Sequence, residues 1–228
     1  DLIFAFENNL MIFYTVVALF SLLIGSFLNV VVHRLPAMMK REWREEAQEF
    51  LESEPELQPT SEPYNLIFPN SHCRKCQHKI KPWENIPLLS YLFLGGKCSA
   101  CQTHISLRYP IVELLTGILT AVVVSNFGLT LTSLACCILT WSLVCLSFID
   151  YDTQLLPDNI TLPLLWLGLI VNSFELVAHF EYAFWGAVVG YLSLWSVNTL
   201  FRLVRGYDGM GYGDFKLLAV LGAWLGWQ

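Results

Sequence analysis

Two closely spaced cysteine pairs are the clearest chemical signal in this 228-residue sequence. Cys73 and Cys76 form one pair, and Cys98 and Cys101 form a second pair after 21 intervening residues. A two-residue spacing lets both sulfur atoms of a pair face one metal ion, and two such turns complete a tetrahedral site. Soft thiolates in that geometry favour zinc or iron–sulfur chemistry. The spacing predicts a structural zinc site, and the alternatives are two disulfides or four free thiols.

The other cysteines and the nearby histidines are interpreted as non-ligands. Four cysteines fill a tetrahedral site, so the neighbouring histidines are expected to be ordinary surface residues: His72, His78 and His104. The remaining cysteines lie in an uncharged stretch, where a buried thiol packs as a small apolar group: Cys136, Cys137 and Cys145.

Two aspartates stand at the ends of apolar stretches. Asp150 directly follows one stretch, and Asp214 ends the segment Gly-Tyr-Gly-Asp before another. Acidic residues in membrane segments are rare and usually functional. If the two carboxyl groups meet, they share a proton as the dyad of an aspartic protease does. The alternative is that Asp214 only caps a helix, as Asp158 is expected to do.

Two further acidic residues remain open to more than one interpretation. Asp152 is interpreted as a solvated loop charge that becomes a catalytic candidate only if the first two aspartates fail. Glu113 is either an interfacial residue or a polar contact within the helix bundle, and its position favours neither reading.

The elements that carry these residues are predicted to be membrane helices. The chain is 55% hydrophobic and 14% charged, against about 25% charged residues in soluble domains. A membrane helix needs about 20 apolar residues, so we predict an all-α polytopic membrane protein. At least six spans are expected, at residues 10–32, 110–125, 129–149, 160–178, 182–203 and from 215 onward.

This order of spans predicts that the two aspartates lie at the same depth in the membrane. Two spans lie between Asp150 and Asp214, so both are expected at the same membrane face. Two glycine patterns in the later spans, Gly186-x-x-x-Gly190 and Gly222-x-x-x-Gly226, are assigned only a helix-packing role. The chain stops at Gln228 before the last apolar stretch is complete, which suggests a clipped C-terminus.

The basic residues predict the orientation of these spans. Ten of the 13 Lys and Arg residues lie between Arg34 and Arg108, and Arg202 and Arg205 end a later span. Loops rich in Lys and Arg usually face the cytoplasm, so this loop and both aspartates are expected there. Stable disulfides are uncommon in that compartment, which favours metal binding by the cysteines. No basic patch indicates nucleic-acid binding.

These features divide the chain into three parts. Residues 1–33 form the first span, residues 34–108 form a cytoplasmic loop, and residues 109–228 form the membrane bundle with both aspartates. The loop contains a glutamate-rich insert at 40–63 and the four-cysteine domain at 70–104. Residues 38–51 are compatible with a solvated or surface-lying helix, and Pro55, Pro59, Pro63 and Pro69 predict an extended linker after it.

Five segments, in order, resemble the type IV prepilin peptidase family. Taken together they span nearly the whole chain, and their order makes the resemblance specific. They are Gly25-Ser26-Phe27-Leu28-Asn29 running to His33-Arg34-Leu35-Pro36; Ser71–Cys76 with Asn85-Ile86-Pro87 and Ser90-Tyr91-Leu92; Cys98 to Pro110; Phe148-Ile149-Asp150 running to Pro157-Asp158; and Gly211–Leu217, which includes the second aspartate motif.

The resemblance implies an activity at the bacterial inner membrane. The family removes a basic leader peptide from prepilins and pseudopilins by cutting after a glycine at the cytoplasmic face. Many members then methylate the new N-terminal amine with S-adenosylmethionine. Asp150 and Asp214 fall on its catalytic aspartates, and the four paired cysteines fall on its zinc ligands. Family members usually have about eight spans.

The residues add two expectations and two rival functions. No Rossmann-type glycine fingerprint is present, so the methyl-donor site is expected to be unconventional and to lie in the zinc-bearing loop. Gly209, Gly211 and Gly213 are predicted to give the active-site loop the freedom to admit a peptide. The rivals are a non-enzymatic membrane adaptor with a cytoplasmic zinc ribbon, and a transporter, which the position of the acids at span ends disfavours.

Overall fold

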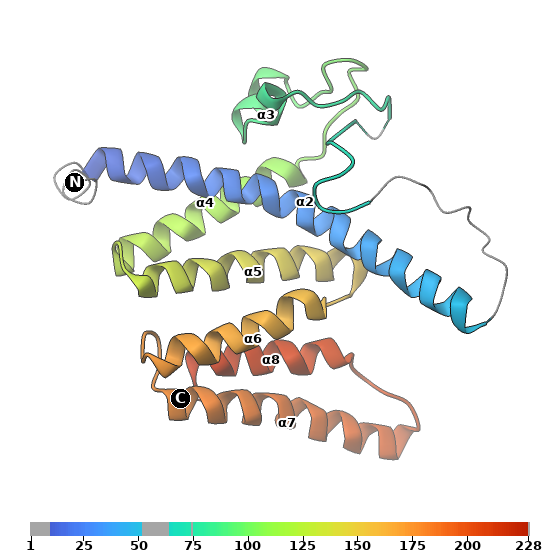
Figure 1. The fold of residues 1–228 in the computed structure, drawn as a ribbon, viewed down its shortest axis with the longest axis vertical. Helices are drawn as coiled ribbons and strands as arrows, with labels where there is room; N and C mark the ends of the chain where they lie inside the picture. The colour runs from blue at the N-terminus through green and yellow to red at the C-terminus, as the bar shows by residue number, and fades with distance from the viewer. Residues whose placement is uncertain (1–9, 52–63, 74, 228) are drawn as a thin grey trace. The chain divides into compact units, whose positions relative to one another are not determined.

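The computed structural model describes residues 10–51, 64–73 and 75–227, and the chain is all-α over these residues. It divides into two compact units, 1–126 and 127–228. The first contains α2 (Leu10–Phe50), the 3₁₀ helix η1 (Pro82–Asn85), α3 (Leu89–Phe93) and α4 (Arg108–Phe127). The second contains α5 (Leu131–Thr153), α6 (Asp158–Ser173), α7 (Phe180–Arg205) and α8 (Tyr212–Leu225) (Figure 1). Three prolines of the predicted linker lie outside the described residues, Pro55, Pro59 and Pro63, and Pro69 lies within them.

Helix α2 is longer than the span predicted for it. It continues past residue 32, where the span was predicted to end, through His33 and Pro36, and ends at Phe50. Proline removes one backbone hydrogen bond from a helix interior, but the charged segment beyond it carries helix-supporting pairs such as Arg41–Glu45 at 2.9 Å. The predicted surface helix at 38–51 is therefore the C-terminal part of α2.

The break between α4 and α5 lies where the turn chemistry placed it. Helix α4 ends at Phe127, and Gly128 has a φ of +64°, which glycine adopts without steric cost. Thr130 then caps α5, because its side-chain oxygen accepts a hydrogen bond from Ser133 N–H at 3.1 Å. The two predicted neighbouring spans are confirmed as separate helices.

Close backbone contact holds α7 and α8 together in the second unit. A Cβ atom on Gly222 would overlap the carbonyl of Gly186, and a Cβ on Gly190 would lie 2.8 Å from Leu218 O. These contacts confirm the packing role assigned to both glycine patterns, because helices approach this closely only where side chains are absent. Gly168 on α6 similarly faces the ring of the fully buried Trp224.

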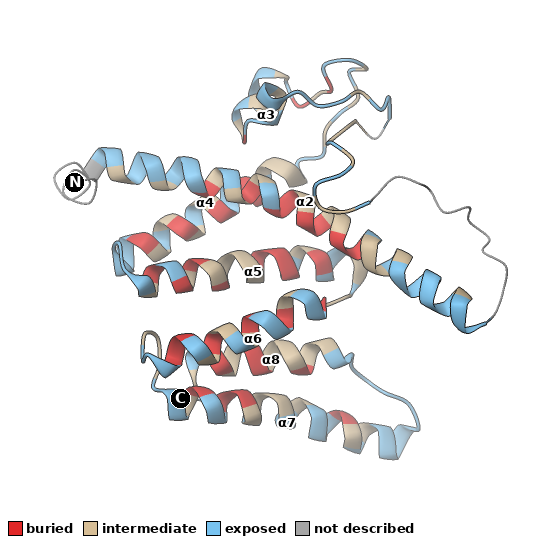
Figure 2. Ribbon diagram, in the orientation of Figure 1, coloured by how far each residue is buried: buried red, intermediate tan, exposed pale blue. Residues whose placement is uncertain are grey.

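Four of the described helices are long and apolar enough to cross a membrane: α2, α4, α5 and α7. Helices α6 and α8 fill the other two predicted segments but have 16 and 14 residues. Figure 2 shows much of α7 exposed, and its exposed side chains include Val197, Leu200 and Leu203. Contiguous exposed apolar surface of this kind suits contact with lipid rather than water.

Candidate active site and metal site

Asp150 lies in the last turn of α5. The helix ends at Thr153 and is capped by Gln154, which has a left-handed backbone (φ +52°) and donates its N–H to the carbonyl of Asp150 at 2.8 Å. This is a common way to close a helix. The Asp150 side chain is exposed at the surface of the second unit.

Asp214 lies in the first turn of α8. Gly211 is the residue that caps this helix, and no side chain caps it. Asp214 instead donates its backbone N–H to Gly211 O at 3.2 Å, and its side chain is partly exposed. The alternative that Asp214 serves as the helix cap is therefore not what the structure shows.

The segments that carry the two aspartates are in contact. A Cβ on Gly213, which precedes Asp214, would lie 2.8 Å from the Cβ of Leu156 in the loop after α5. Lys216, in the same turn of α8, binds both carboxylate oxygens of Asp158 at 2.7 Å. The start of α8 therefore lies against the loop that joins α5 to α6 and against the start of α6, at one end of the second unit.

Asp158 has a different role from the cap expected for it. Pro157 occupies the cap position of α6, and Asp158 is the first helical residue. Its carboxylate is engaged by Lys216, 58 positions along the chain. Asp152 is exposed, but it lies inside α5 and not in a loop as expected for it.

Two of the three glycines before Asp214 are closely packed, Gly209 and Gly213, whereas a Cβ on Gly211 would meet only Asp214 Oδ2, at 3.9 Å. A Cβ on Gly209 would lie 2.8 Å from Cδ1 of Phe201, and Gly213 is covered by Leu156. Neither residue has a positive φ; in this loop that conformation belongs to Gly206, at +84°. Their predicted flexibility for peptide entry stays a prediction.

The four paired cysteines converge on one point in the first unit. Cys73, Cys76, Cys98 and Cys101 have sulfur atoms within 4.8 Å of one another. The Cys73–Cys101 and Cys76–Cys98 sulfur distances are 3.8 and 3.9 Å. Zinc–sulfur bonds of about 2.3 Å in a tetrahedron place sulfur atoms about 3.8 Å apart. The donor set therefore fits zinc, and the separations exceed the roughly 2.05 Å of a disulfide bond.

Each cysteine pair is shaped by the same local backbone pattern. The N–H groups of Cys73 and Cys98 donate to His78 O and Thr103 O, both at 2.9 Å. Gln77 and Gln102, which directly follow the pairs, both have a φ of +58°. The repeated turn presents two thiols from each side, so the sequence spacing acts through two equivalent knuckles.

Hydrogen bonds favour the thiolate form at two of the four cysteines. The side chain and backbone of Thr103 lower the pKa of Cys101 to about 6. Backbone hydrogen bonds from Cys76 and Lys75 lower the pKa of Cys73. At Cys76 a backbone hydrogen bond at His78 lowers the pKa, but burial and hydrogen bonds to the other three cysteine side chains outweigh it and raise the pKa to about 12. The thiolate is the metal-binding form, so the two lowered pKa values suit a metal site.

The nearby histidines lie outside the cysteine cluster. His72 Nδ1 is 2.9 Å from Asn70 O, and His78 Nε2 is 3.5 Å from Glu84 Oε2. His104 pairs with Lys97 in an isolated β-bridge. The metal-competent group found among the described residues contains the four cysteines alone, as predicted.

Two contacts connect the segment between α2 and α4, which contains the four clustered cysteines, to these two helices. Glu113, buried in α4, accepts a hydrogen bond from Leu88 N–H at 2.9 Å, and Gly25 on α2 lies against its backbone. Arg34 on α2 donates to the carbonyls of Asn65 and Leu66 at 3.0 and 3.2 Å. Glu113 is therefore a polar contact inside the first unit, one of the two interpretations left open.

Sequence reasoning missed one residue near the second aspartate, Asn198 on α7. Its buried side chain binds three consecutive residues of the α7–α8 loop, Asp208, Gly209 and Met210. A buried amide in an apolar helix needs hydrogen-bond partners, and that requirement was the available signal.

Comparisons with known proteins assign both halves of the chain. Residues 19–127 match the bacterial peptidase A24 N-terminal domain, and residues 137–228 match the type IV leader peptidase family. A prepilin leader peptidase/N-methyltransferase of Stutzerimonas stutzeri is 58% identical over 97% of this chain and 76% of its own length. Relatives of the same name from Pseudomonas aeruginosa and Neisseria gonorrhoeae are 61% and 51% identical, each over 92% of this chain and over 72% and 73% of their own lengths. No solved structure matches.

Proposed function

Because this chain belongs to the type IV leader peptidase family, we propose that it is an aspartic endopeptidase of the bacterial inner membrane. It removes the leader of type IV prepilins or type II secretion pseudopilins after a glycine at the cytoplasmic face. It then methylates the new N-terminal amine with S-adenosylmethionine. The contact between Gly213 and Leu156, which brings the segments of the two aspartates together, is the observation that carries the catalytic assignment.

Asp150 and Asp214 are the proposed catalytic pair. One carboxylate is ionised and accepts a proton from water as the water oxygen attacks the scissile carbonyl. The other is protonated and donates to the carbonyl oxygen, and the tetrahedral intermediate then expels the amine, which takes up a proton. No covalent enzyme intermediate forms.

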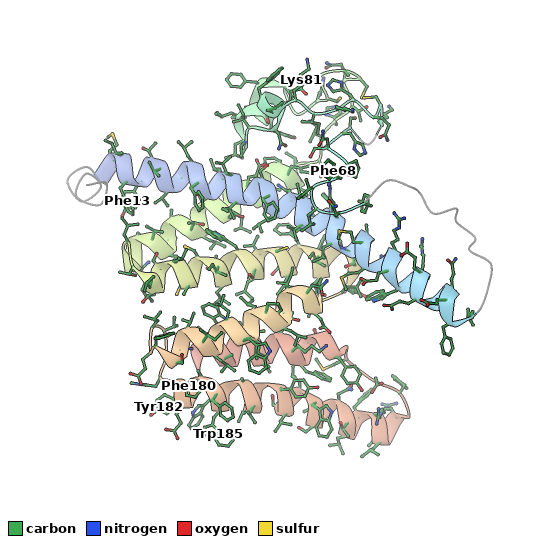
Figure 3. All side chains as sticks on the ribbon, in the orientation of Figure 1. Phe13, Phe68, Lys81, Phe180, Tyr182 and Trp185 are labelled. Carbon is green, nitrogen blue, oxygen red and sulfur yellow. The ribbon has the colours of Figure 1, made fainter. Side chains whose placement is uncertain are left out.

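The charge distribution supports a cytoplasmic active site. Arg202 and Arg205 end α7, next to the loop that leads to Asp214. The opposite end of α7 carries aromatic side chains, and Figure 3 shows Phe180, Tyr182 and Trp185 there. Basic residues mark cytoplasmic ends and aromatic residues mark membrane interfaces. A prepilin whose apolar helix lies in the bilayer would place its leader junction at this face.

The cysteine cluster is the proposed structural zinc site. Four protein ligands leave no open coordination position, so the ion would stabilise the 70–104 segment rather than activate water. Glu113 on α4 binds this segment at Leu88, and Arg34 on α2 binds Asn65, a few residues before it. We place the methyl-donor site in this part of the chain.

The catalytic assignment is tested by co-expressing a prepilin with Asp150→Asn or Asp214→Asn enzyme and determining the pilin N-terminus by mass spectrometry. The wild type is expected to yield a shortened, methylated pilin, and each variant is expected to leave the leader intact, a loss of at least about 1,000-fold given the role of both carboxyls. Asp152→Asn, a substitution of an exposed acid in the same turn of α5 as Asp150, is the matched control and should cut normally. Cleavage by well-folded Asp150→Asn or Asp214→Asn enzyme would contradict the assignment.

A further inference from the structure

The α7–α8 loop, which leads to Asp214, is exposed. One buried side chain, that of Asn198, is hydrogen-bonded to it. Asn198, in α7, is 4% exposed, whereas Tyr207, Asp208, Gly209 and Met210 are all exposed. Its Oδ1 accepts hydrogen bonds from the N–H groups of Gly209 and Met210 at 2.9 and 3.1 Å. Its amide nitrogen donates to Oδ1 of Asp208 at 3.2 Å. Three of the four hydrogen-bonding positions of this amide are therefore used on three consecutive loop residues.

Neighbouring side chains on the same face of α7 support this attachment. Phe201 and Arg202 follow Asn198 by three and four residues, the spacing that places side chains on one helix face. The Phe201 ring covers Gly209 and meets the Tyr207 ring edge-on, with centroids 5.5 Å apart. Arg202 is 3.8 Å from Asp208, but both groups are exposed, and exposed ion pairs contribute little. The buried amide is therefore the main polar anchor of the loop.

The anchored loop ends directly at the cap of the helix that carries Asp214. Met210 precedes Gly211, which caps α8, and Asp214 bonds back to Gly211 through its N–H. From the other side, Gly213 is packed against Leu156. Three glycines in residues 206–211 give this segment many alternative conformations unless it is held. The hydrogen bonds that Asn198 accepts from Gly209 and Met210 restrict the conformation of the residues next to α8.

We propose that Asn198 is a positioning residue for Asp214, which fixes the α7–α8 loop so that the first turn of α8 presents its carboxyl group in one arrangement. The inference depends on the proposed peptidase function. A displacement of about 1 Å at a reacting group can lower a rate by about 100-fold. Loss of the anchor should therefore lower kcat, while leaving the binding of the apolar substrate helix, and hence KM, nearly unchanged.

The test measures kcat and KM for prepilin cleavage by purified full-chain Asn198→Leu enzyme, normalised to folded protein by thermal unfolding in detergent. The expected result is a 10- to 100-fold lower kcat with KM within about twofold of wild type. Asn172→Leu is the matched control. Asn172 is fully buried and hydrogen-bonded to Ala223 O, Trp224 O, Val177 N–H and Ala178 N–H, at the other end of α8. It should lower the unfolding temperature but leave kcat per folded molecule unchanged.

Exchanging the side-chain types of Asn198 and Asp208 distinguishes an effect on the position of Asp214 from an effect on folding. Asn198→Asp retains the acceptor for Gly209 and Met210 but places a carboxylate against Asp208, and should lower kcat. The double variant Asn198→Asp/Asp208→Asn restores the donor from the opposite side and should recover most of the lost kcat. The single and the double variant test whether Asn198 positions Asp214 even if Asn198→Leu does not fold.

Two results would overturn the inference. One is a wild-type kcat in folded Asn198→Leu enzyme, and the other is an exchange variant no faster than Asn198→Asp alone. Asp150→Asn and Asp214→Asn are measured alongside. If the wild type does not cut the substrate, the proposed peptidase function fails, and if Asp150→Asn or Asp214→Asn cuts it, the catalytic assignment fails. If the wild type cuts it, neither aspartate variant does, and Asn198→Leu cuts at the wild-type rate, only the role of Asn198 fails.

Discussion

Cys98 shows how a single residue can report on the proposed metal site. It is the most buried of the four clustered cysteines, and its sulfur lies 3.9 Å from that of Cys76. Its backbone N–H donates a hydrogen bond to Thr103 O in the turn of the second cysteine pair. A metal ion held by this cluster would therefore stabilise both knuckles at once.

At this scale we predict that Cys98→Ser removes the metal. Purified wild-type protein should contain about one zinc ion per chain, and the variant should lose most of it because a hydroxyl is a poor substitute for a thiolate ligand. Elemental analysis by mass spectrometry measures this directly. Cys136→Ser, on α5 and away from the cluster, is the matched control and should retain full zinc content. Equal zinc in wild type and Cys98→Ser would contradict the assignment of this site.

The pairing of α7 with α8 is the clearest feature at the scale of elements. Gly186 and Gly222 face one another so closely that the two helix backbones are in contact. This pair matters for catalysis because α7 carries Asn198 and α8 carries Asp214. The same contact therefore supports both the helix that anchors the loop and the helix that bears the proposed catalytic group.

We predict that Gly222→Ala destabilises the second unit. The added methyl group would overlap the Gly186 carbonyl, and overpacking of this kind costs about 1–3 kcal/mol. The measurement is thermal unfolding of the detergent-solubilised protein. Gly117→Ala is the matched control, because its Cβ would lie 3.4 Å from the Leu22 side chain, an ordinary contact. An unchanged unfolding temperature in Gly222→Ala would mean that the helices do not pack this closely.

For the molecule as a whole, the proposed function requires a particular orientation in the membrane. Helix α7 has 26 residues, about 39 Å at 1.5 Å per residue, enough to cross a hydrocarbon core of about 30 Å. Arg202 and Arg205 lie in its last turn, and basic residues mark the cytoplasmic end of a span. Asp214 follows the arginine-rich end and should face the cytoplasm.

Reporter fusions test this orientation. Alkaline phosphatase needs the disulfides that form outside the cytoplasm, so fusion after Ala178, before α7, should be active. Fusion after Tyr207, beyond α7, should be at least about tenfold less active because a span with arginines at its end keeps that end inside. β-Galactosidase fused at the same positions provides the reciprocal control. The reverse pattern of activities would place the proposed active site on the wrong side.

Features that depend on neighbours in the chain were predictable from the sequence. The metal cluster follows from two Cys-x-x-Cys turns, because chelation by each pair is a local property of the backbone. The helix positions follow from long apolar runs, and the α4–α5 break follows from Gly128 and Thr130. The order of motifs was enough to indicate the family, which the relatives confirm.

Features that depend on partners distant in the chain were decided by the tertiary structure. Asp158 resembled a helix cap but pairs with Lys216, and Glu113 had two possible roles until its contact with Leu88 was seen. The role of Asn198 was not predicted from the sequence, because the role of a buried amide depends on the groups that it binds. A residue's type and local spacing determine what chemistry it can do, but packing between segments determines which group it meets.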